Sequence, residues 1–188
     1  MKFTIGIAGI FVSIIAVLFL VGSQSVQSVE MPDSVKPANT NSPISIRIPK
    51  INVNANLESV GLKSDGSMAE PKDPTQAAWF NLGPRPGESG NAVINGHFGW
   101  KNNISAVFDD LSALSVGDTI YTEDDKGIIT TFEVREVRMF KETEDSSSVF
   151  GIGDGNAHLN LITCGGVWNK TSKSYSNRLV VFTNKIKN

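Results

Sequence analysis

The clearest strand patterns in the chain are LNLITCGG at residues 159–166 and RLVVF at residues 178–182. Both are rich in Leu, Ile and Val, and each reads as a strand, at 159–163 and 179–182. The segment between them, 165–177, begins with two glycines and reads as a loop that reverses the chain. We therefore expect an antiparallel pair in which Arg178, at the start of one strand, lies beside Cys164, at the end of the other.

Further short β-patterned runs precede this pair. Gly, Pro, Asn and Asp residues separate them, as all-β folds require. Helical periodicity is limited to residues 104–114 (ISAVFDDLSAL), which predicts a short amphipathic helix or a 3₁₀ turn. A closed or nearly closed β-barrel fits this pattern best. The additional predicted strands are 44–48, 92–94, 119–122 and 128–137.

Composition narrows the class of protein. The chain has 188 residues, of which 40% are hydrophobic, so one catalytic domain with a real core is the expectation. The formal net charge is −2, with both signs interspersed, which provides no basic surface for nucleic acid.

The N-terminus predicts export. Residues 3–22 carry no charge and are long enough to cross a bilayer as a helix, and Lys2 precedes them. The positive-inside rule then places the rest of the chain outside the cytoplasm. A cleaved signal peptide is the alternative, and it exports the domain equally. We expect an anchor at 1–22, a Ser-, Asn- and Pro-rich tether at 23–42 and a folded domain at 43–188.

Cys164 is the only cysteine, so an exported chain offers it no intramolecular disulfide partner. It is then either a small buried hydrophobic residue or a nucleophile. Gly165 and Gly166 follow it directly, which favours an accessible thiol at a strand end and hence a nucleophile.

A thiol nucleophile needs a base, and the chain has two histidines. His158 lies six residues before Cys164 on the same predicted strand, about 20 Å away at roughly 3.3 Å per residue, and cannot pair with the thiol. His97 follows a strand and is flanked by Gly96 and Gly99, so it is the candidate acid/base, against the alternative of a structural histidine. The Arg178 guanidinium would hold a substrate carbonyl oxygen or favour the thiolate, unless it is simply a surface arginine.

Several motifs in this order resemble the sortases, membrane-anchored cysteine transpeptidases of mainly Gram-positive surfaces. The resemblance rests on WF at 79–80, PGESGNAVINGH at 86–97, VFDDL at 107–111, VGD at 116–118, and LITC at 161–164 with Arg178 downstream. It implies an eight-stranded β-barrel with His97 as general acid/base, Cys164 as nucleophile and Arg178 as stabiliser of substrate and oxyanion. One departure is Asn160, where the family usually has threonine.

The resemblance also implies a reaction and partners. The thiolate would cleave a Leu-Pro-x-Thr-Gly-type sorting signal between Thr and Gly, and an amine of the peptidoglycan precursor or of a surface protein would resolve the thioester. The compact size and Cys-Gly-Gly sequence are most similar to sortase classes E or F. A hydrolase using the same residues, a silent membrane-tethered barrel that binds peptide or wall polymer, and a thiol redox protein are the alternatives.

No cofactor is predicted. Calcium, which some class A sortases bind, would need carboxylates to converge, and loop carboxylates are usually solvated. Trp100 and Trp168 lie close in sequence to His97 and Cys164 and either line the peptide groove or simply pack. The carboxylates considered for calcium are Asp109, Asp110, Glu142 and Glu144.

Overall fold

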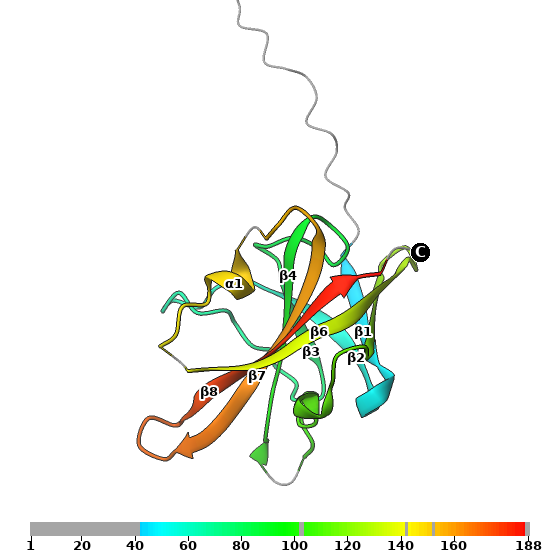
Figure 1. Ribbon diagram of the computed structural model, residues 1–188. Coiled ribbons are helices and arrows are strands. Elements are labelled where there is room, and N and C mark those ends of the chain that lie inside the picture. Colours follow the sequence, from blue (N-terminus) through cyan, green and yellow to red (C-terminus); the bar gives the residue numbers. More distant parts are fainter. Residues whose placement is uncertain (1–41, 102–103, 142, 152, 187–188) are drawn as a thin grey trace, which may run out of the picture. The chain divides into compact units, whose positions relative to one another are not determined.

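The computed structural model describes residues 42–101, 104–141, 143–151 and 153–186 (Figure 1). Asn39–Asn188 form one compact unit. The predicted anchor at 1–22, and the tether at 23–42 except for its last residue, lie outside the described residues. Within the described ranges, none of the helices has the length and apolar character needed to cross a membrane.

Eight strands of the described chain close into a barrel in the order β1-β2-β3-β4-β7-β8-β6-β5. All neighbours are antiparallel except β2 with β3 and β4 with β7, which are parallel. The all-β, eight-stranded barrel with short helices is therefore confirmed. The strands are β1 (Pro43–Ile48), β2 (Val53–Val60), β3 (Ala77–Phe80), β4 (Gly90–Gly96), β5 (Thr119–Asp124), β6 (Ile129–Lys141), β7 (Ala157–Asn169) and β8 (Ser174–Lys185); the helices are η1 (Pro49–Ile51), η3 (Leu111–Ala113) and α1 (Ser147–Phe150).

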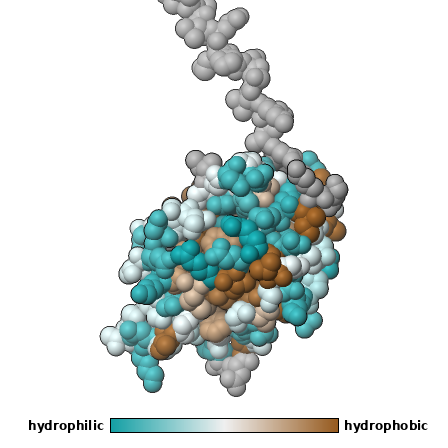
Figure 2. Space-filling view, viewed as in Figure 1, coloured by the Kyte–Doolittle hydropathy of each residue, from teal (hydrophilic) through white to brown (hydrophobic). Residues whose placement is uncertain are grey.

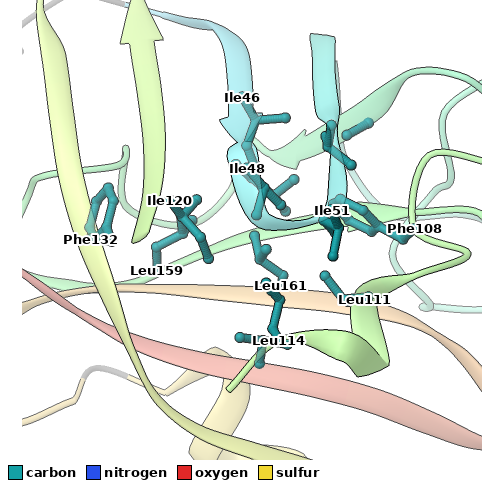
Figure 3. Packing of buried hydrophobic residues seen from close by; sticks show 14 of the residues in the cluster. Ile46, Ile48, Ile51, Phe108, Leu111, Leu114, Ile120, Phe132, Leu159 and Leu161 are labelled. Carbon is teal, nitrogen blue, oxygen red and sulfur yellow. The ribbon is translucent and has the colours of Figure 1, made fainter. Parts of the chain in front are cut away.

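The barrel interior is filled by aliphatic and aromatic side chains from every wall (Figure 3). Because side chains alternate across a strand, each wall has a second, outer face. On β4, β7 and β8 part of that outer face is covered by a smaller apolar cluster, which includes Val149 of α1. The surface in Figure 2 is mostly hydrophilic, with apolar areas between. The labelled interior residues in Figure 3 are Ile46, Ile48, Ile51, Phe108, Leu111, Leu114, Ile120, Phe132, Leu159 and Leu161.

The predicted loop at 165–177 is wrong. β7 continues to Asn169 and β8 begins at Ser174, so the two strands extend as a ribbon past the point where the loop was expected (Figure 1). The glycines mark a bulge, with Gly166 at φ +78° and the pairing shifted between Gly165 and Trp168. Cys164 therefore lies within a strand and not at its end.

Residues 104–114 form no long helix, and only Leu111–Ala113 are helical, as 3₁₀. The backbone N–H of Val107 donates to Pro74 O and that of Phe108 donates to His97 O. Both amides are therefore bonded to carbonyls distant in sequence and not to the carbonyls of a helix. The 3₁₀ alternative is the one that forms. This segment packs Phe108 against the end of β4.

Replacing Gly96 by alanine is expected to lower the free energy of unfolding by about 2 kcal/mol or more, the usual cost of overpacking. An added Cβ would lie 2.5 Å from Val107 Cγ1 and 2.6 Å from Phe108 Cδ2. Gly61→Ala is the control, because its nearest neighbour would be Asn81 Oδ1 at 3.6 Å. Urea denaturation of both variants measures the difference, and equal stabilities would contradict the packing argument.

Candidate active site

The outer faces of β4, β7 and β8 share one register. Asn95 of β4 is paired with Ile162 of β7, which is paired with Val180 of β8. Two residues further along, Cys164 is the direct partner of Arg178. Because the side-chain repeat of a strand is two residues, Ile162 and Cys164 share a face, and so do Val180 and Arg178. The expected Cys164–Arg178 pairing is confirmed.

His97 enters the same row from the end of β4. The last residue pair between β4 and β7 is Asn95 with Ile162, and His97 lies just past the end of β4. The same register continued by two residues would place His97 level with Cys164. Thr163 Oγ1 donates to Gly96 O over 2.7 Å, which ties the residue before Cys164 to the residue before His97. The register of the three strands thus directs the three predicted catalytic residues to one end of the outer face, in what we call the cross-strand row.

The His97 ring is held on two sides. Its Nε2 lies 2.8 Å from the carbonyl oxygen of Pro71. Its ring centroid lies 4.6 Å from that of Trp100, with the planes tilted by 54°. Trp100 therefore packs against the imidazole. Sequence reasoning missed Pro71, because a backbone carbonyl contributed by a segment 26 residues away leaves no side-chain signature.

Arg178 is half-buried and anchored to its own strand. Its Nη1 donates to Tyr175 O and to Asn177 O, both over 3.0 Å. These bonds hold the planar guanidinium to β8, and the residue that carries it is the direct cross-strand partner of the half-buried Cys164. A fixed cation at this place favours an anionic sulfur or oxygen in front of it.

Aromatic side chains pack together where the β7–β8 ribbon begins, close to the cross-strand row. Tyr175 is in edge-on contact with Phe98, at 5.5 Å between ring centroids, and with Trp168, at 5.0 Å. Trp168 remains 48% exposed. The ribbon thus presents an amphipathic aromatic surface beside Arg178, and Tyr175 is a residue that sequence reasoning did not single out.

His158 lies at the opposite end of the face, as predicted, and is not part of this row. Its Nδ1 faces Thr183 O at 3.0 Å and its Nε2 faces Asp154 Oδ1 at 2.9 Å. A polar cavity of about 410 Å³ opens here, lined by Asn91, Arg135, Ser147, Ser148, Gly153, Asp154, His158 and Asn184. It includes none of the three predicted catalytic residues.

The carboxylates considered for calcium do not converge with other ligands in the part of the chain that is described, where no group of three or more His, Cys, Asp or Glu could hold a metal. Asp109 instead accepts hydrogen bonds from the backbone of Gly99 and Ala106, and Glu144 pairs with Arg138. Glu142 lies outside the described residues. Asp109 thereby links the backbone at Gly99 to the backbone at Ala106.

A family model described as the sortase domain matches residues 46–186. The chain therefore belongs to the sortase family, whose members are cysteine transpeptidases that act on surface proteins bearing a sorting signal and on amines of the cell wall. No curated protein matched the sequence significantly.

Solved sortases share the fold. Sortase C-1 from Actinomyces oris is 24% identical over 78% of this chain and 76% of its own, with a TM-score of 0.62. Sortase C-1 from Streptococcus pneumoniae is 24% identical over 77% and 67%, with a TM-score of 0.61. Sortase A from Corynebacterium diphtheriae is 22% identical over 79% and 62%, with a TM-score of 0.59.

Thr163→Val is expected to lower the free energy of unfolding by about 1–2 kcal/mol, because it removes the buried bond to Gly96 O at nearly constant volume. Thr163→Ser keeps the hydroxyl and is the matched control. Urea denaturation compares the two variants. A serine variant as unstable as the valine variant would show that the methyl group matters and the hydrogen bond does not.

Asp154→Asn is expected to destabilise the protein at neutral pH and to matter less in acid. The His158 ring N–H, followed by the Asn156 amide, holds the pKa of Asp154 well below its usual range. A depressed pKa means that the ionised carboxylate stabilises the fold above its unfolded pKa of about 3.9, and that this contribution is lost as the pH falls through the folded pKa.

Denaturation midpoints of wild type and Asp154→Asn at pH 7 and in steps below pH 4 test this expectation. Asp110→Asn, a change of the same charge at an exposed site, is the control. A gap between wild type and Asp154→Asn that stays constant down to the acid transition would contradict it.

Proposed function

We propose that the chain is a transpeptidase that cleaves a Leu-Pro-x-Thr-Gly-type sorting signal between Thr and Gly and joins the new acyl group to an amine. The amine belongs to the cell-wall precursor or to a surface protein. The proposal is carried by one observation, the cross-strand row of His97, Cys164 and Arg178 in a member of the sortase family.

The row supplies each group that acyl transfer to a thiol requires. The Cys164 thiolate attacks the Thr carbonyl carbon, and the guanidinium of Arg178 stabilises the oxygen that becomes negative. His97 protonates the departing glycine amine, leaving a thioester on Cys164. The acceptor amine then attacks the thioester carbon and returns its proton to His97, and the thiolate is released. No metal or cofactor takes part in these steps.

The short connection between β6 and β7 supports a small sortase, and the N-terminal apolar sequence supports a domain outside the cytoplasm. Between Lys141 and Ala157 the described chain contains only the short helix α1 (Figure 1), so the large insertion of class B enzymes has no room here. We place the enzyme in class E or F. The apolar segment 1–22 would anchor it in the cell membrane as a single span, with sorting-signal proteins as partners.

The test mixes the protein with a Leu-Pro-x-Thr-Gly peptide, with or without a glycine-based amine, and measures the masses of thioester, ligated and hydrolysed products. Cys164→Ala is expected to abolish all three. Arg178→Lys is expected to lower kcat by about 10²-fold, because it replaces the planar fork at the oxyanion. Arg138→Lys, the same change on neighbouring β6, should stay within about twofold of wild type.

The outcomes separate the alternatives. Ligated product that requires Cys164 supports the transpeptidase. Hydrolysed product alone, with every amine offered, would identify a hydrolase. No thioester with any of a panel of related signals, together with peptide binding that survives Cys164→Ala, would identify a silent binding barrel.

A further inference from the structure

The hydrogen bond between His97 and Pro71 decides how the imidazole is protonated. A backbone carbonyl oxygen has no hydrogen to give, so at 2.8 Å the Nε2 atom must be the donor. The flipped ring would place Cε1 against the same oxygen and would lose the bond. Nε2 therefore carries a hydrogen in the neutral ring as well as in the cation.

We infer that Nδ1 of His97 is the atom that exchanges protons, and that Pro71 O, positioned by Asn95, fixes this tautomer. The inference rests on the proposed function for its role in catalysis. A neutral imidazole has two nitrogens, of which one carries a hydrogen and only the other can accept a proton. If Nε2 is committed to Pro71, the base that serves Cys164 is Nδ1.

The segment that presents Pro71 O, which we call the strap (residues 69–72), is held at several points. The backbone N–H of Ala69 donates to Gly61 O over 2.9 Å, and Asn95 Nδ2 donates to Ala69 O over 3.0 Å. The backbone N–H of Lys72 donates to Glu58 Oε1 over 3.0 Å. The Pro71 carbonyl is thus bracketed by anchored neighbours.

Asn95 and His97 act on the strap in the same way. Asn95 lies near the end of β4 and His97 just past it, two residues on, and they donate to the alternate carbonyls of Ala69 and Pro71. Asn95 Oδ1 is buried and has no hydrogen-bond partner in the described structure, so its amide group is oriented by the bond to the strap alone. Asn95 is therefore a positioning residue, acting on His97 through the strap.

The proton balance follows from this arrangement. Nδ1 takes the proton of the Cys164 thiol, which gives a thiolate and an imidazolium with both nitrogens protonated. When the scissile C–N bond breaks, the Nδ1 proton goes to the leaving amine and the ring returns to the Nε2–H form. The incoming amine later gives its proton to Nδ1, and the acyl C–N bond forms as the C–S bond breaks. The Pro71 carbonyl accepts the same Nε2–H throughout.

Nitrogen NMR of the full chain labelled with ¹⁵N at the histidine rings tests the tautomer without substrate. We expect the neutral His97 ring to show a protonated Nε2 and an unprotonated Nδ1. His158 is the internal reference, and His158→Gln assigns the signals because the chain has two histidines. A protonated Nδ1 with an unprotonated Nε2 in wild type would overturn the inference, whatever the enzyme's activity.

Asn95→Leu tests the positioning role, because it removes the donor to the strap at similar volume. We expect kcat to fall about tenfold, KM to stay within about twofold, and the Nδ1–H tautomer to appear at His97. Asn91→Leu is the matched control on the same face of β4, because Asn91 Nδ2 donates to Ser148 O, at the other end of the strand.

Each result has one meaning. An unchanged tautomer and kcat in Asn95→Leu would overturn the role of Asn95, as would an equal loss of kcat in Asn91→Leu. If no variant or wild type transfers a peptide, the proposed function fails, but the NMR result still decides which nitrogen carries the proton.

Discussion

The register between β4, β7 and β8 is the constraint on which the site depends. Three residues distant in sequence meet only because a parallel pair and an antiparallel pair share the middle strand β7. A slip of one residue in either pair would turn Cys164 or its partner into the barrel interior, where Leu161 and Leu179 now pack. The core that those leucines fill therefore fixes the geometry of the catalytic row.

Packing at Gly96 and His97 fixes the position of the chain at the end of β4. Phe108 packs so closely on Gly96 that a Cβ would not fit, and the backbone of Phe108 donates to His97 O. The turn at residues 107–110 therefore covers the strand end while leaving the histidine on the outer face. A glycine before the histidine is thus a packing requirement, and the Thr163 bond to Gly96 O adds the link to β7.

The sequence was sufficient for the elements that carry strong patterns. Aliphatic runs predicted both strands around Cys164 and Arg178, and the separation along one strand excluded His158. It failed where a residue type is ambiguous: Gly165 and Gly166 were read as a loop, but they form a bulge in a continuing strand. β2 and β3 were missed because Asn and Ala residues weaken their β signal. They form as strands because they pair with each other and with β1 and β4 on either side.

The two histidines differ in their hydrogen-bond partners, and these partners, more than the residue type, indicate whether a histidine is structural or catalytic. Both lie on the same outer face, at opposite ends. His158 has an oxygen partner at each nitrogen, the carbonyl of Thr183 and the carboxylate of Asp154, so both sides of its ring are engaged in holding β7 to β8 and to the preceding loop. His97 gives Nε2 to a carbonyl and stands in register with a thiol. A ring fixed by one nitrogen keeps the other for chemistry, and the backbone of the strap, rather than a carboxylate, provides that fixation in this barrel.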